Sequence, residues 1–391
     1  MGRPDLKTGI VHRVICGSFD HPGSFPGLVE KEVTRNRALS SADRRELGNL
    51  LHDAVRWRRR VWGDIAPTTI DLEQSVKRLS EARALKDQPP MARWNGQSME
   101  ALARELSFPT WMIEAWVRQF GLASTVSLAL ALNEPAPVTL RVNTLKSDRT
   151  GLLAAFSKEG VSAAEGKHSP WAVHLMERKN LRSLKSFKRG WFEVQDEASQ
   201  VAVLAADVKP GEHVIDVCTG AGGKALAVAA AMKNRGKIFA VDSDSRGFSE
   251  LMARAKRAGV TILETGWVAA DDPNPYPAME GRADVVFLDA PCSSLGTLRR
   301  HPWSKWSLPP AAAETFPKKQ MALLTRFARW VRPGGRLVYA TCTLSHRENE
   351  GLVEAYLEAD LAFALRGEPR LLRPDVDGTD GFFTALLERR T

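Results

Sequence analysis

Long apolar runs are missing from this sequence of 391 residues. No segment approaches the roughly 20 apolar residues of a membrane-spanning helix, and residues 1–20 lack the basic and apolar regions of a signal peptide. We therefore expect a cytoplasmic protein without membrane contact. Cysteine is also scarce, and its four copies form no CxxC pair, which speaks against a disulfide scaffold and against a metal site. The four are Cys16, Cys218, Cys292 and Cys342.

Acidic residues are outnumbered, since 55 lysines and arginines against 46 aspartates and glutamates give a formal net charge of +9. A basic excess favours a polyanionic partner, and nucleic acid is the first candidate. A solvated basic surface is the alternative. The length exceeds one ordinary hydrophobic core, so we expect two or three domains. We expect a monomer, although no sequence pattern addresses the oligomeric state.

Residues 1–95 are predicted to form a helical region. Ser40 or Ser41 can cap a helix with a single apolar stripe, and its far end carries the basic run Arg56–Arg60. That run either complements the helix dipole or contacts RNA. Pro89 and Pro90 indicate a linker. The stripe comprises Leu47, Leu50, Leu51 and Ala54.

Residues 96–195 are predicted to form a small α/β domain that binds RNA. Its elements are a helix over 111–120 capped by Thr110 and ended by Gly121, a helix over 148–158, and strands over 138–142, 171–175 and 191–194. Strand 138–142 alternates apolar with polar residues, which predicts one buried and one exposed face. We expect this sheet to expose Arg141, with Lys185, Lys188 and Arg189 in the adjoining loop.

Residues 196–391 are predicted to form the largest domain, a doubly wound, mostly parallel sheet, because short strands alternate with helices from 213–217 onward. The turn after that strand, 218–224, is rich in glycine and precedes a helix, as in many cofactor sites. Asp242 ends the next strand, where a carboxylate can accept the hydroxyls of a ribose. The turn lacks the GxGxxG pattern of dinucleotide enzymes, so S-adenosylmethionine fits better than a nicotinamide cofactor.

Two cysteines follow predicted strands of this sheet. Strand 285–288 leads into Asp289-Ala290-Pro291-Cys292, and strand 336–340 leads into Thr341-Cys342. Neighbouring parallel strands would bring both thiols to one edge of the sheet. Two thiols beside a methyl donor suit the methylation of cytosine at carbon 5, because a thiolate that adds to carbon 6 activates the ring. The alternative is that both cysteines are only small hydrophobic residues at strand ends.

A basic and aromatic segment, 299–306, comes soon after Cys292. Cations and flat rings together suit phosphates and unstacked bases, so we expect this segment and Arg141 to hold RNA. The residues concerned are Arg299, Arg300, His301, Trp303, Lys305 and Trp306.

Four motifs resemble those of a known family: VIDVCTGAGGK, VFLDAPCSSLGTLRRHPWSKW, LVYATCTLSHRENE and GTDGFF. They are similar to the ordered motifs of the RNA cytosine-5 methyltransferases of the NOL1/NOP2/Sun type, in particular the bacterial ribosomal RNA branch called Sun (Fmu). The resemblance covers residues 105–391. Upstream, RRELGNLLHDAVRWRRR looks like the NusB-like helical domain of that branch. The resemblance implies a Rossmann-like class I methyltransferase domain, the cofactor S-adenosylmethionine and a ribosomal RNA substrate.

The resemblance also implies roles for individual residues. Cys342 corresponds to the nucleophile of the family, and Cys292 to the cysteine that assists release of the methylated product. Asp289 and Lys224 would hold the target base. The cofactor-binding residues would be Cys218, Thr219, Gly220, Ala221, Gly222, Gly223, Lys224, Asp242, Arg246, Asp271 and Asp289.

The sequence departs from the family pattern at several positions. Ala221 replaces a proline, Ser294 a glycine, and Gly247 stands where the family has the arginine that this chain carries at 246. We expect these departures to affect cofactor affinity more than activity. Two other functions stay open, a transfer RNA cytosine methyltransferase and a non-catalytic RNA-binding assembly factor.

Overall fold

The computed structural model of the protein describes residues 3–67, 69–87 and 96–391. The linker predicted at Pro89 and Pro90 lies outside these residues. The chain forms two compact units, one comprising 1–135 with 297–312 and the other 136–296 with 313–391. The described helices after residue 95 and before 135 therefore join the helical unit, whereas our sequence boundary assigned them to the small α/β domain.

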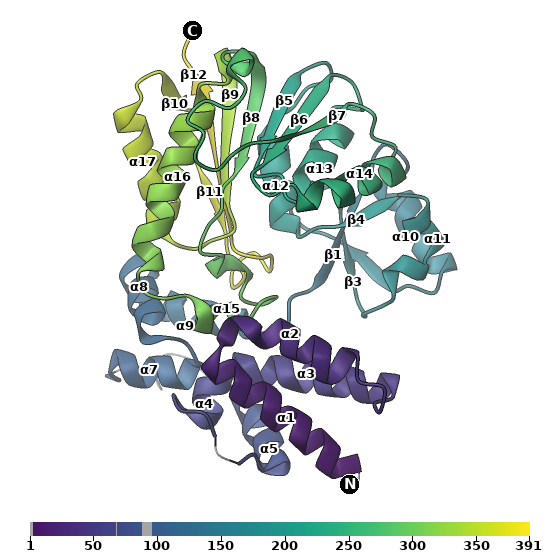
Figure 1. Ribbon diagram of the computed structural model, residues 1–391, viewed down its shortest axis with the longest axis vertical. Coiled ribbons are helices and arrows are strands. Elements are labelled where there is room, and N and C mark those ends of the chain that lie inside the picture. The colour runs from purple at the N-terminus through teal and green to yellow at the C-terminus, as the bar shows by residue number, and fades with distance from the viewer. Residues whose placement is uncertain (1–2, 68, 88–95) are drawn as a thin grey trace. The chain divides into compact units, whose positions relative to one another are not determined.

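The described residues of the first unit form helices joined by short loops, with no strand among them (Figure 1). Helix α3 (Ser41–Arg56) begins as predicted, because Ser40 and Asp43 form a reciprocal capping box, and its apolar stripe buries Leu47, Leu51 and Ala54. The other helices are α1 (Arg3–Asp20), α2 (Phe25–Val29), a π-helical turn (Glu30–Thr34), α4 (Arg58–Trp62), α5 (Leu72–Arg83), α7 (Met99–Leu106), α8 (Thr110–Phe120), α9 (Leu122–Leu132) and α15 (Ser304–Ser307).

The second unit begins with a small antiparallel sheet in the order β2-β3-β1-β4. Its strands are β1 (Val138–Val142), β2 (Ala163–Glu165), β3 (Ala172–Leu175) and β4 (Phe192–Val194), with helices α10 (Arg149–Lys158) and α11 (Lys185–Lys188). Leu152 and Phe156 of α10 pack on the sheet. Strand β1 is where we predicted it, but the prediction of one exposed face is wrong, since four of its five residues are buried.

The large sheet of the second unit has the strand order β10-β12-β9-β8-β5-β6-β7, with β11 paired to β12. Neighbours from β9 through β7 run parallel, which confirms the doubly wound fold class, and β12 is antiparallel to β9, β10 and β11. The strands are β5 (His213–Val217), β6 (Lys237–Asp242), β7 (Leu263–Trp267), β8 (Ala283–Asp289), β9 (Val331–Thr341), β10 (Phe363–Leu365), β11 (Arg370–Leu372) and β12 (Phe382–Arg389).

Helices cover both faces of this sheet (Figure 1). Alternate residues of one strand point to opposite faces: Val285 and Phe287 of β8 join the core under α12 (Glu197–Ala205), α13 (Gly223–Ala231) and α14 (Arg246–Ala258). Val286 and Leu288 join the core under α16 (Ala312–Ala328) and α17 (Glu350–Ala359). The predicted motifs begin at the carboxyl ends of parallel strands β5, β6, β8 and β9.

Candidate active site

The turn between β5 and α13 has a backbone that only small residues tolerate. Gly220 and Gly222 have φ angles of +52° and +74°, and Cys218 also lies in the left-handed region at +59°. A Cβ atom on Gly222 would lie 1.9 Å from Cδ1 of Leu251. This turn opens helix α13, whose first backbone N–H groups favour a negative ligand group.

Two carboxylates flank the turn. Asp242 ends β6, as predicted, and its Oδ2 accepts a hydrogen bond of 2.8 Å from the Gly220 N–H. Asp216 of β5 is buried and accepts a 2.6 Å hydrogen bond from Thr219 Oγ1, and burial raises its pKa to about 7. Each oxygen of Asp242 accepts a hydrogen bond from a backbone N–H, which leaves further lone pairs for ribose hydroxyls.

The end of β8 carries an ion pair. Lys224 Nζ lies 2.5 Å from Asp289 Oδ2, and the two side chains are 12% and 30% exposed. The aromatic ring of Phe382 lies beneath the ammonium group, with its centroid 5.0 Å from Nζ. Lys224 and Asp289 are 65 residues apart in the sequence, and the parallel pairing of β5 with β8 brings their motifs together.

The two predicted thiols meet at this edge of the sheet. Because β8 and β9 are parallel neighbours, Sγ of Cys292 lies 3.4 Å from Sγ of Cys342. Both cysteines are half-buried and reduced. The expectation that the strands bring them to one edge is confirmed.

The pKa values of the two thiols move in opposite directions. The hydrogen bond from Cys292 lowers the pKa of Cys342, and Ser294 and Lys224 add to this effect. The same thiol contact, together with burial, raises the pKa of Cys292. The contact with Cys292 thus favours the thiolate of Cys342, and a thiolate is the nucleophilic form of cysteine.

A buried network that we did not predict connects the two cysteine loops. Glu348 is 1% exposed and accepts hydrogen bonds from the Ser293 N–H (2.9 Å), from Ser293 Oγ (2.5 Å) and from Gln320 Nε2 (3.0 Å). Ser293 Oγ lies 2.6 Å from Thr343 Oγ1, so residues next to both cysteines share this carboxylate. Gln320 also donates to the carbonyl of Pro291.

Asn349 holds the Cys342 loop from its other side. Its Oδ1 accepts a 2.6 Å bond from Thr341 Oγ1, and its Nδ2 donates to the carbonyl of Thr343 at 3.1 Å. Thr341 and Thr343 are the neighbours of Cys342 in the chain. Glu348 and Asn349 lie inside the motif LVYATCTLSHRENE, which was their only signal in the sequence.

Two residues of the predicted cofactor set lie apart from these contacts. Arg246 is 90% exposed and pairs with Asp244, whose pKa it lowers to about 2. Asp271 is exposed in the loop after β7. Gly247 explains the displacement of the arginine, since a Cβ atom there would lie 2.6 Å from the carbonyl oxygen of Gly220. The roles of Arg246 and Asp271 as cofactor ligands remain predictions.

Two of the predicted RNA contacts, Arg141 and Lys305, have buried side chains. The expectation that the small sheet exposes Arg141 is therefore wrong, and both residues stay untested as RNA contacts. Arg141 is 2% exposed; it donates a 2.7 Å bond to the carbonyl of Gly223 and another bond to Gln195, so it links the small sheet to the glycine-rich turn. Lys305 is 1% exposed, and its ammonium group donates to the carbonyl of Arg56 and to Asn133 Oδ1.

The remaining predicted RNA residues lie in the helical unit. Trp303 stacks on Phe25, and the indole N–H of Trp306 donates to the carbonyl of Val55 at 2.8 Å. His301 is exposed, and Arg299 and Arg300 are half-buried. These five residues stay untested as RNA contacts. In the described part of the chain, no cluster of potential metal ligands occurs and no helix is long and apolar enough to span a membrane.

Comparison with known proteins agrees with this geometry. Residues 203–388 match the family described as 16S rRNA methyltransferase RsmB/F, and residues 108–182 match its ferredoxin-like domain. The chain is 31% identical over 306 residues to the probable ribosomal RNA small subunit methyltransferase B of Bacillus subtilis, covering 74% of this chain and 68% of that protein. The chain belongs to the RsmB/F family of methyltransferases.

Other members and solved structures extend the match. The chain is 33% identical to the probable ribosomal RNA small subunit methyltransferase B of Synechocystis, over 67% of this chain and 59% of that protein. The solved structure of PH0851 superposes with a TM-score of 0.80 at 26% identity and covers 100% of this chain and 99% of that one. As an RsmB/F member the chain is an S-adenosylmethionine-dependent methyltransferase with a class I fold and a ferredoxin-like small domain.

Proposed function

We propose that this RsmB/F member methylates carbon 5 of a cytosine in ribosomal RNA through a covalent adduct between Cys342 and carbon 6 of the base. The observation that carries the proposal is the pair of thiols 3.4 Å apart at the edge formed by β8 and β9. The pKa of Cys342 is lowered by its contact with Cys292, and a lowered pKa activates a nucleophile.

Each residue at this edge has a role in the proposed reaction. The Cys342 thiolate forms a bond to carbon 6, and the electron pair of the ring double bond becomes available at carbon 5. Lys224 and Asp289, 2.5 Å apart, would hold the polar edge of the base, where charge develops during addition. After methyl transfer, the proton on carbon 5 leaves to a base, and the bond from Cys342 to carbon 6 breaks. Cys292, in contact with Cys342, is the nearest candidate to assist this release.

The chain's residues fit S-adenosylmethionine, which supplies an electrophilic methyl group when bound. The glycine-rich turn opens helix α13, whose first N–H groups favour a negative ligand group, and Gly222 lets the turn pack against Leu251 of α14. Asp242 is positioned at the end of β6 with lone pairs available for a ribose. The buried Asp216 holds Thr219 and thereby the conformation of the turn.

The test is methylation of unmodified 16S ribosomal RNA by the purified protein with S-adenosylmethionine, read by bisulfite sequencing. One cytosine that resists conversion, and that becomes convertible with Cys342→Ala, supports the proposal. Transfer RNA is run in parallel. Protection of transfer RNA alone would keep the chemistry and replace the substrate, whereas cofactor binding without methylation of either RNA would favour a non-catalytic assembly factor.

A further inference from the structure

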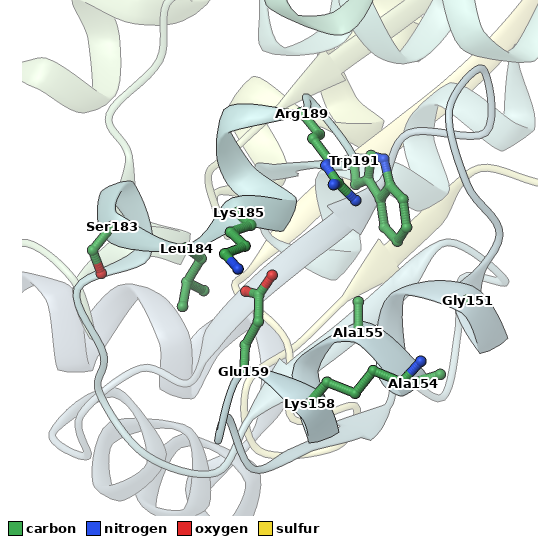
Figure 2. A pocket seen from close by; sticks show the side chains of 10 residues that line it. All are labelled: Gly151, Ala154, Ala155, Lys158, Glu159, Ser183, Leu184, Lys185, Arg189 and Trp191. Atoms are coloured by element: carbon green, nitrogen blue, oxygen red, sulfur yellow. The ribbon is translucent and has the colours of Figure 1, made fainter.

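A pocket outside the active site lies on the small sheet of the second unit. Its volume is about 620 Å³, which falls within the range of ligand sites in proteins. Helix α10 forms one wall, and the segment that leads through α11 to β4 forms the other (Figure 2). The residues that matter for its chemistry are Lys158, Glu159, Lys185, Arg189 and Trp191.

The pocket is positively charged. Lys158, Lys185 and Arg189 are exposed, and within the described residues none of the three forms an ion pair with a carboxylate. Glu159 is engaged elsewhere, because its two carboxylate oxygens accept hydrogen bonds of 2.9 Å from the backbone N–H and the hydroxyl of Ser186. The three cations are therefore available to a negatively charged ligand.

An aromatic ring completes the site. Trp191 is half-buried and packs against the core of the small sheet, and the guanidinium carbon of Arg189 lies 5.9 Å from its ring centroid. Figure 2 shows the ring at one side of the pocket with Arg189 beside it. Flat rings next to cations are the groups that hold unpaired nucleotides, with the base on the ring and the phosphates at the cations.

The pocket is fixed to the methyltransferase domain. Gly190, next to Trp191, has a φ of +72°, and a Cβ atom there would lie 2.0 Å from the carbonyl oxygen of Arg257 in α14. Asn143 Nδ2 donates to the carbonyls of both Gly190 and Ala258, at 2.8 and 2.9 Å. A ligand held in the pocket would thus keep a constant position relative to the cysteines of the same compact unit.

We propose that this pocket docks an unpaired nucleotide of the RNA substrate, with its base stacked on Trp191 and the flanking phosphates at Lys158, Lys185 and Arg189. This inference rests on the proposed function, since it names a second contact for the same RNA. It also supplies what the buried Arg141 and Lys305 do not, a set of exposed cations with an aromatic platform.

Binding is tested first, without turnover, by fluorescence anisotropy with a labelled single-stranded RNA of mixed sequence. Lys185→Glu with Arg189→Glu should weaken binding and reduce the magnitude of the salt-dependence slope by roughly 0.7 for each phosphate that the protein no longer neutralises. The matched control is Arg235→Glu with Lys237→Glu, two exposed cations before β6 and at its start. An equal loss of affinity in the control pair would overturn the proposal.

Trp191 is tested separately. Trp191→Ala should weaken binding of the single strand about five- to one-hundred-fold. Trp191→Phe should retain most of the affinity. Duplex RNA should bind Trp191→Ala and the unchanged protein equally well. Equal loss with single-stranded and duplex RNA would exclude stacking. Because Trp191 contacts the core, thermal unfolding is measured alongside, and the exposed charge pair tests the site if Trp191→Ala unfolds.

Turnover separates this proposal from the proposed function. With 16S ribosomal RNA, the charge-reversed pair should raise KM about tenfold or more at unchanged kcat, because the pocket lies away from the reacting atoms. Unchanged KM in an active enzyme would overturn the pocket proposal alone. If the unchanged protein binds RNA through the pocket but never methylates it, the proposed function fails and the pocket proposal stands.

Discussion

The two halves of one sequence stretch, 283–306, lie in different units of the structure and place their polar residues in different surroundings. The first half, through Cys292, ends at the edge of the large sheet with a half-buried thiol and a carboxylate that pairs with Lys224. From residue 297 onward, the second half belongs to the helical unit, where Lys305 is buried and Trp306 donates to a backbone carbonyl. Both halves carry residues that suit RNA chemistry, but only the first presents them at a strand end where open α/β sheets bind ligands.

The difference shows what a residue type can indicate by itself. Open α/β sheets bind ligands at the carboxyl ends of their strands, and Asp289 and Cys292 lie at that end of β8. A lysine in a helical unit can instead satisfy carbonyl groups, as Lys305 does for Arg56. A charged residue in the sequence predicts a group that it can pair with, and that group can be a carbonyl of the same protein instead of a ligand.

The strongest test of this contrast is the removal of the proposed nucleophile, Cys342, which Cys292 of the first half contacts at the sheet edge. Cys342→Ala should reduce methylation by at least about three orders of magnitude, because the ring then lacks its activating bond. S-adenosylmethionine binding, measured by calorimetry, should not change. Cys16→Ala is the matched control, since Cys16 lies in the helical unit and bonds to the carbonyl of Pro67. Substantial turnover in Cys342→Ala would refute the nucleophile role.

The second thiol should give a different phenotype. Cys292→Ala should allow addition and stall release, so that a covalent complex of protein and RNA accumulates and survives denaturing electrophoresis. The expected loss of turnover is about 100-fold. A variant with normal turnover and no complex would contradict the release role.

Cys292→Ala should also change the pH dependence of Cys342. The hydrogen bond from Cys292 is the main cause that lowers the pKa of Cys342. Its removal disfavours the thiolate, so the pKa rises and the rate of alkylation by iodoacetamide should reach its midpoint at higher pH. The measurement follows Cys342 by mass spectrometry of the modified peptide. A midpoint that stays in place or moves to lower pH would show that Cys292 does not stabilise the thiolate.

Glu348 accepts hydrogen bonds from Ser293, the residue after Cys292. Its substitution should lower kcat less than the loss of Cys342 does. In Glu348→Gln, an amide N–H₂ replaces one acceptor oxygen and faces donors such as the Ser293 N–H, so the two cysteine loops should shift. We expect kcat to fall about 10- to 100-fold with little change in the KM for S-adenosylmethionine.

A shift of the alkylation midpoint of Cys342 distinguishes this positioning role of Glu348 from general destabilisation. Glu350→Gln is the control, since Glu350 occupies the same motif but pairs with His346. Equal losses of kcat in both variants would argue against a specific role of Glu348.

Sequence patterns predicted the parallel strands and the thiol edge because both depend on local signals. Apolar runs set strands β5, β6, β8 and β9, and parallel pairing then fixes which of their ends meet. The antiparallel strands β10, β11 and β12 were missed, since the sequence after Cys342 gave no helix between them to signal a crossover.

The network around Glu348 escaped prediction for a different reason. Its partners Gln320 and Ser293 lie 28 and 55 residues away, and nothing local reveals which donors a buried carboxylate meets. The burial of Lys305 was equally hidden, because its acceptors belong to Arg56 and Asn133, 249 and 172 residues away. Long-range polar contacts are fixed by packing, and no periodicity encodes them.

Replacing the buried Lys305 tests whether the second half of the stretch 283–306 stabilises the helical unit. Lys305→Met keeps the volume but leaves the carbonyl of Arg56 and Asn133 Oδ1 without their donor. Each buried acceptor left unsatisfied costs about 1–3 kcal/mol, so the helical unit should lose about 3 kcal/mol of stability in chemical denaturation. Lys185→Met, at an exposed site, should change stability by less than about 0.5 kcal/mol.

The two lysines should also separate in RNA binding and in their response to pH. Burial lowers the pKa of Lys305, so the folded state binds fewer protons than the unfolded chain between that lowered pKa and the ordinary value of 10.5. Stability from this residue should therefore rise as pH increases through that window, and Lys305→Met should abolish the rise.

In the folded protein Lys305→Met should leave RNA affinity unchanged, while Lys185→Met should weaken it. If Lys305→Met weakened RNA binding and Lys185→Met did not, the second half of the stretch would be an RNA contact after all.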